Sequence, residues 1–267
     1  MNVSQLFSFN LKYYVASRGN DTYPDSDNNA EGAYLLKPDS NMPHQFNYSD
    51  YLGCVEFEQG YYIAQWTFKY YDNVSDEYAY AKVIFAPYYN ELIEFKVELN
   101  GIPVMKDGDG KDVTVDWYFY DFEANNTFWT DSNGLEMQER ILNYRPTWNY
   151  SGDQNISANY YPVGSGIAMR DINSARQVTI VNERAQAGSA NLIPNSIELI
   201  QNRRLLYDDN RGVGEALNET GPDGYGLQIN ARYWLQIHDR STSHSMQRQQ
   251  QLKVDLPLQY FFCFDYT

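Results

Sequence analysis

The densest group of side chains that could do chemistry lies between residues 203 and 215, directly after a strand-like run. Arginines and carboxylates alternate there: Arg203, Arg204 and Arg211 with Asp208, Asp209 and Glu215. Buried charges are costly unless they are paired, so these side chains could form an internal ion-pair network that fixes a long loop. Alternatively Arg211, beside the small Gly212 and held by Asp208 or Asp209, presents its planar guanidinium outward. Such a group can hold neighbouring sugar hydroxyls through charge-assisted hydrogen bonds.

Other reactive patterns are weaker. The histidines His44, His238 and His244 stand at no spacing that would place two of them on one metal, so we interpret them as surface or hydrogen-bonded side chains. Residues 107–112 begin like a calcium-binding loop but lack its twelve-residue frame and terminal Glu, which favours a hairpin turn. Carboxylates are abundant, yet no pair can be assigned as the two acids of a glycosidase.

Composition excludes some classes of partner. The net charge of −15 would repel nucleic-acid backbones and anionic lipid surfaces. No apolar run reaches the roughly 18–20 residues that a membrane-spanning helix needs. An aromatic content of 16%, with 25 tyrosines, favours strands, because aromatic side chains fit a pleated and half-buried surface.

Eight Asn-X-Ser/Thr triplets predict N-glycosylation and therefore a secretory route, to a lysosome or vacuole or out of the cell. They begin at Asn2, Asn20, Asn47, Asn73, Asn125, Asn149, Asn155 and Asn218. The first twenty residues lack a signal-peptide pattern, so we expect a fragment of something longer or a processed chain. Cys54 and Cys263 could bridge each other, bridge another segment or stay as thiols, and the sequence does not choose.

Period-two alternation of apolar and polar residues dominates the chain and predicts strands with one buried face. It runs through residues 62–70, 95–99, 113–119 and 252–256, with turn signals at 106–110, 131–134 and 221–224. Residues 135–142 could form two helical turns, although they stand between strand-like segments. We therefore predict an all-β fold, a large and extended antiparallel β-sandwich. A polar stretch near Asp39–Tyr51 divides it into a small N-terminal β unit (1–50) and a main sandwich (51–267).

Four blocks in colinear order resemble the C-terminal β-region of the class II α-mannosidases, glycoside hydrolase family 38, and its lysosomal branch in particular. The first is Gly32-Ala33-Tyr34-Leu35-Leu36-Lys37-Pro38, hereafter the GAY block. The others are Phe128–Gly134 with Arg140 and Tyr144–Trp148, then Asn159–Val163, and last Arg184–Ser189 running on to Glu215. Ala187 stands where the family usually has Gly, and residues 59–113 and the tail after Arg240 depart from its pattern.

The resemblance implies that the catalytic machinery precedes this chain. An upstream domain would hold zinc and supply the nucleophilic Asp and the acid of a retaining mechanism. This chain would bind no cofactor, would be inactive alone, and would lend Tyr34 and Arg211 to the mannose pocket, with Asp208 and Asp209 supporting the loop. Its partners would be that catalytic domain and mannose-containing glycans. Two rival interpretations are a carbohydrate-binding module derived from the family and a structural glycoprotein.

Overall fold

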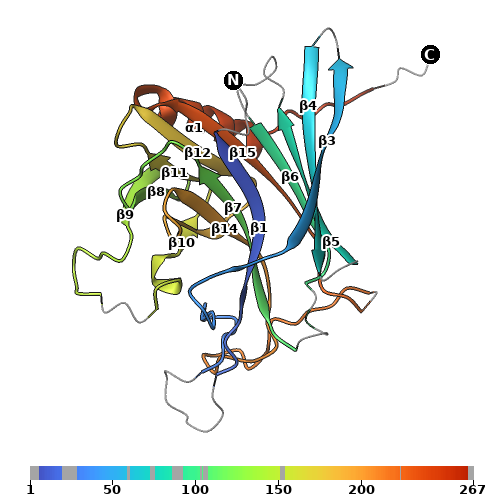
Figure 1. Cartoon of the computed structure of the whole chain (residues 1–267), viewed down its shortest axis with the longest axis vertical. Coiled ribbons are helices and arrows are strands. Elements are labelled where there is room, and N and C mark those ends of the chain that lie inside the picture. Colours follow the sequence, from blue (N-terminus) through green and yellow to red (C-terminus); the bar gives the residue numbers. More distant parts are fainter. Residues whose placement is uncertain are drawn as a thin grey trace.

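The chain folds as a sandwich of two antiparallel sheets, as the computed structural model of Figure 1 shows. The structure describes residues 6–19, 29–58, 61–72, 76–85, 93–102, 104, 108–150, 154–222 and 224–263, and the side chains of 50–58, 61–64, 72, 76, 77 and 85 are left aside. The all-β prediction is confirmed.

The first sheet has six strands and the second has nine, and every described strand pairing is antiparallel. In spatial order the six are β10 (Tyr161–Val163), β13 (Gln186–Ala190), β14 (Ser196–Arg204), β7 (Lys111–Phe119), β1 (Phe7–Val15) and β2 (His44–Gln45). The nine are β3 (Asn47–Glu58), β4 (Tyr61–Asp72), β5 (Asp76–Phe85), β6 (Ile93–Leu99), β15 (Ile229–Asp239), β12 (Arg176–Asn182), β11 (Gly166–Arg170), β8 (Thr127–Ser132) and β9 (Glu136–Ile141).

One apolar core fills the space between the sheets. Strand β7 contributes Val113, Val115 and Trp117, each fully buried, and β1 adds Phe9 beside the Trp117 ring at 5.4 Å. Strand β1 pairs with β7 along its whole length, Phe7 opposite Phe119 through to Val15 opposite Lys111. The N-terminal residues 7–15 thus lie inside the six-stranded sheet, with their apolar side chains in the same core as those of the later strands.

A second buried layer, on the other face of the six-stranded sheet, is charged. We call it the charged layer: Lys12 from β1, Asp112 and Asp116 from β7, Glu198 and Arg203 from β14, and Glu31 from the segment after β1. The strand register places Glu198 opposite Asp116 and Arg203 opposite Asp112. The Nζ of Lys12 lies 2.8 Å from Oδ1 of Asp116. The pattern of β7 is therefore apolar on one face and acidic on the other, with both faces buried.

Glu198 is a buried member of the charged layer, only 1% exposed. Its carboxylate accepts hydrogen bonds from the hydroxyls of Tyr14, at 3.1 Å, and of Tyr160. Burial raises the pKa of Glu198 to about 7, helped by the charge of Asp116 and opposed by these hydrogen bonds and by Lys12. Burial likewise raises the pKa of Asp116, against the effect of Lys12.

One local prediction is wrong, and one alternative that the sequence left open is not realised. Residues 252–256 are not a strand but the end of helix α1 (Arg240–Asp255), which packs on β12 and β15. Asp239 caps this helix by accepting the N–H of Ser241 at 2.9 Å, and its buried face is made of Ser243, Gln247, Gln250 and Gln251. Residues 135–142 are not helical, because they enter β9 after a turn in which Asp131 accepts the N–H of Gly134 at 2.8 Å. A short 3₁₀ turn, η3 (Ser157–Asn159), precedes β10.

Candidate functional site

The GAY block and the loop after β14 meet through one carboxylate. Asp209 is fully buried, and its Oδ2 accepts the backbone N–H groups of Tyr34 at 2.6 Å and Leu35 at 3.0 Å. Its Oδ1 accepts the N–H of Arg211 at 3.0 Å, and its carbonyl accepts Nδ2 of Asn29 at 2.9 Å. Asp209 therefore fixes the backbone of both predicted substrate-binding residues at once.

Tyr34 and Arg211 lie side by side at the surface. Tyr34 is 59% exposed, Arg211 is exposed, and a Cβ built on Gly212 would stand 3.5 Å from the Tyr34 ring. The segments that carry them lie at the same end of the sandwich, the blue one after β1 and the orange one after β14 in Figure 1. A phenol hydroxyl and a guanidinium are thus carried at the surface on backbone that Asp209 fixes, and both groups are able to contact hydroxyls.

Arg203 clamps the GAY block to the sheet. Its Nε lies 2.7 Å from Oδ1 of Asp112, and its Nη2 lies 2.8 Å from Oε1 of Glu31. The same Nη2 donates to the carbonyls of Gly32, at 3.2 Å, and Leu35, at 2.8 Å. Burial and the nearby charge of Asp112 raise the pKa of Glu31, although Arg203 opposes this. The clamp thus joins the charged layer to the segment that carries Tyr34.

This geometry corrects the ion-pair hypothesis for the cluster. Arg203 pairs with Glu31 and Asp112 rather than with Asp208, Asp209 or Glu215. The guanidinium of Arg204 donates to Oδ1 of Asn218 at 2.7 Å and to the carbonyl of Ile102 at 2.8 Å. Asp209 holds backbone amides, and the partly buried Asp208 keeps its supporting role as a prediction. Arg203 and Arg204 therefore fix the loop through partners that lie outside it in the sequence.

Sequence reasoning did not identify Asn29 and Glu31 as parts of the site. A lone carboxylate at Glu31, directly before the apolar GAY block, was the available signal, because a charged side chain placed there must either be solvated or meet a cation. The partner, Arg203, lies 172 positions away, and only the fold brings the two together.

Gly32 sets the distance between the two segments. A Cβ built on Gly32 would lie 2.7 Å from both Cβ and N of Asp209, closer than unbonded atoms allow. We expect Gly32→Ala to displace Asp209 and destabilise the protein by about 1–3 kcal/mol, as overpacked sites do. Thermal unfolding of Gly32→Ala beside the neighbouring Ala33→Ser variant checks this, and equal melting temperatures would contradict it.

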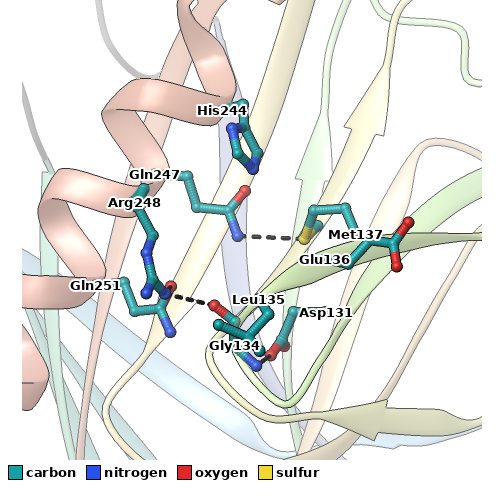
Figure 2. A pocket seen from close by; sticks show the side chains of 9 residues that line it. All are labelled: Asp131, Gly134, Leu135, Glu136, Met137, His244, Gln247, Arg248 and Gln251. Carbon is teal, nitrogen blue, oxygen red and sulfur yellow. Dashed lines mark hydrogen bonds between the residues drawn. The ribbon is translucent and has the colours of Figure 1, made fainter.

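The contact between α1 and the β8–β9 turn encloses only a small cavity. Figure 2 shows His244, Gln247 and Arg248 of the helix facing Gly134 and Met137. Arg248 donates a hydrogen bond to the Gly134 carbonyl, and Nε2 of Gln247 lies 3.2 Å from Sδ of Met137. The cavity measures about 10 Å³, room for a single water at most, so it cannot hold a sugar.

The remaining predicted residues divide by accessibility. Among the sequon asparagines, Asn47, Asn125, Asn149, Asn155 and Asn218 are exposed, and Asn2, Asn20 and Asn73 lie outside the described residues.

Cys263 is an exposed free cysteine, and the side chain of Cys54 is not described. His44 stacks on Tyr13, with ring centroids 5.2 Å apart. Across the described ranges no cluster of three or more His, Cys, Asp or Glu could hold a metal ion, and no helix there is long and apolar enough to cross a membrane.

Comparison with known proteins places this chain in a family. Residues 22–211 match the model of the glycosyl hydrolases family 38 C-terminal domain. Lysosomal alpha-mannosidase of Bos taurus is 34% identical over 240 residues, 89% of this chain and 22% of the relative, and that of Homo sapiens is 42% identical over 131 residues, 48% of this chain and 12% of the relative. The chain thus spans about a fifth of the bovine protein. An alpha-mannosidase from Enterococcus faecalis V583 shares the fold, with a TM-score of 0.62 at 13% identity over 93% of this chain and 28% of that one. This chain belongs to the C-terminal domain family of the family 38 glycosyl hydrolases.

Proposed function

We propose that this chain is the C-terminal β-domain of a zinc-dependent, retaining α-mannosidase that hydrolyses glycoprotein glycans. In this proposal an upstream domain holds the zinc and the catalytic carboxylates, and this chain packs on it and completes the mannose pocket. The observation that carries the proposal is the joint fixation of Tyr34 and Arg211 by the buried Asp209, which presents two hydrogen-bonding groups at one surface point.

The roles of the two side chains follow from their chemistry. The guanidinium of Arg211 donates through a planar fork, so it can bind two adjacent hydroxyl oxygens of mannose. The Tyr34 hydroxyl can donate to one sugar oxygen and accept from another. A lysosomal or vacuolar location is supported by the names of the mammalian relatives and by the exposed sequons.

Substitution of these residues in the full-length protein tests the proposal. A hydrogen bond to a charged group contributes about 1.5–3 kcal/mol, so Arg211→Ala should lower kcat/KM on an aryl α-mannoside by roughly 10- to 100-fold. Tyr34→Phe should lower it less, since the lost hydrogen bond is neutral. Neither variant should change the melting temperature by more than a degree or two, because both side chains lie at the surface.

Two controls separate binding from folding. Tyr207→Phe alters another exposed tyrosine of the same loop and should leave kcat/KM unchanged. If Arg211→Ala unfolds early and keeps normal kinetics, Arg211 is a structural residue and its binding role is wrong. The isolated chain should hydrolyse no aryl α-mannoside, and robust turnover by it would contradict the division of labour. Strong glycan binding by the isolated chain would favour the carbohydrate-binding alternative instead.

A further inference from the structure

A polar pocket lies where the end of the GAY block faces the residues before η3. Its volume is about 210 Å³, and its lining includes the apolar residues Pro38 and Ile156. Its polar side chains come from two segments: Lys37, Asp39, Ser40 and Asn41 on one side, Gln154 and Asn155 on the other. We call it the Asn155 pocket, because Asn155 is the asparagine of the sequon Asn155-Ile156-Ser157.

Both walls of the pocket are fixed by hydrogen bonds. Nδ2 of the buried Asn159 donates to the carbonyl of Asn155 at 2.7 Å and to Oδ1 of Asn143 at 2.8 Å. On the facing wall, the N–H of Asp39 donates to the carbonyl of Val15 at 2.9 Å, and this anchors the segment to β1. The backbone that carries the Asn155 side chain is therefore fixed at the edge of a preformed pocket.

We propose that Asn155 carries an N-linked glycan whose first N-acetylglucosamine packs in the Asn155 pocket. The inference rests on the secretory route of the proposed function. In the modification, Nδ2 of Asn155 forms a bond to C1 of an oligosaccharide carried on a lipid diphosphate. The C1–O bond to that diphosphate breaks, the lipid diphosphate leaves, and one amide proton passes to solvent.

The lining suits a neutral sugar better than an ion. Lys37 and Asp39 contribute one charge of each sign, and Nζ of Lys37 already donates to the carbonyl of Asn29 at 3.0 Å. Asn41 and Gln154 supply amide donors and acceptors that match hydroxyl and acetamido groups. Because the sugar is tethered, its effective concentration is in the millimolar range or higher, so weak contacts are enough to keep it in place.

Site-resolved deglycosylation of the full-length protein tests the inference. Glycopeptide mass spectrometry should find Asn155 occupied. An endoglycosidase that cuts within the glycan core should release the Asn155 glycan from the native protein about tenfold more slowly than the Asn125 glycan, which corresponds to about 1.4 kcal/mol. Asn125 is the matched control, because it is exposed in the turn before β8. After denaturation both glycans should be released at the same rate.

A variant links the protection to the pocket. Asn41→Ala with Gln154→Ala should keep Asn155 occupied and bring its native release rate to that of Asn125. An unmodified Asn155 beside a glycosylated Asn125, equal native release rates in the wild type, or protection that survives in the double variant would each overturn the inference. No glycan at any sequon would overturn the secretory route as well, whereas aryl α-mannoside turnover reports on the proposed function separately.

Discussion

Arg203→Met should destabilise the protein by about 3–5 kcal/mol, the range found when one partner of a buried ion pair is removed. Arg203 neutralises Glu31 and Asp112, which are 1% and 0% exposed. Methionine replaces the aliphatic part of the Arg203 side chain but has no guanidinium, so it leaves two buried carboxyl groups without their cation. The free energy of local opening, measured by native-state hydrogen exchange on amides of β14, gives the size of this effect.

Arg18→Met is the matched control. Arg18 pairs with Asp109, but its side chain is 54% exposed, and surface pairs contribute about 0–1 kcal/mol. Adding Glu31→Gln and Asp112→Asn to Arg203→Met should recover much of the loss, because no unpaired charge then remains buried. If Arg203→Met proves no more destabilising than Arg18→Met, the clamp does not hold the GAY block in place.

The fold was predictable because the signal is local. Alternation in residues 62–70, 95–99 and 113–119 matches β4, β6 and β7, since a strand with a buried face must place apolar residues at every second position. Strand β7 also shows what alternation hides. Its polar positions Asp112 and Asp116 suggest a solvated face, yet both are buried. Asp116 is paired with Lys12 of β1, and Asp112 is paired with Arg203 of β14.

Helix α1 was missed for the converse reason. Its buried positions are Ser243, Gln247, Gln250 and Gln251. The residues that repeat at helical spacing are therefore polar, and the helix has no apolar periodicity from which it could be predicted. The chance alternation of Leu252, Val254 and Leu256 then favoured a strand. Asp239 followed by Ser241 was the available signal, because these residue types favour helix caps.

The site was predictable only in part. Composition and spacing identified the cluster around Arg211 but could not say which carboxylate serves which arginine, because ion-pair partners are set by the tertiary fold. Tyr34 was selected through the family resemblance alone, because no sequence pattern distinguishes one exposed tyrosine from the others in a chain that has 25. The common support, Asp209, becomes visible only when the two loops are placed together.

The charged layer should make the protein more stable in acid than at neutral pH. Around Glu198 lie Lys12 and Tyr14 from β1, Asp112 and Asp116 from β7, and Tyr160 from the segment before β10. The pKa of Glu198 rises from 4.5 to about 7, so between these pH values the folded state holds a proton that the unfolded chain has lost. The contribution of Glu198 is therefore complete below pH 4.5 and is lost as the pH rises through 7, by about 3 kcal/mol, and the raised pKa values of Glu31 and Asp116 act in the same direction.

Asp171 shifts the other way without disturbing this window. Burial opposes the change, but hydrogen bonds from Ser174 and Arg176 lower the pKa of Asp171 to about 2. Its contribution is present above the ordinary pKa of 3.8 and is lost only as the pH falls from there toward 2.

Glu198→Gln isolates the effect. Glutamine keeps the oxygen that accepts from Tyr14 and Tyr160 but cannot ionise, so the variant should gain about 2.5 kcal/mol over the wild type between pH 5 and pH 8. The measurement is the opening free energy of β14 amides by hydrogen exchange at both pH values, corrected for the intrinsic pH dependence of exchange. The general repulsion of a chain with a net charge of −15 also grows with pH, but it cancels in this difference because both proteins share it. A constant difference between variant and wild type across that range would show that Glu198 is already ionised in its buried site at pH 5, with its charge stabilised by Lys12 and the two tyrosine hydroxyls.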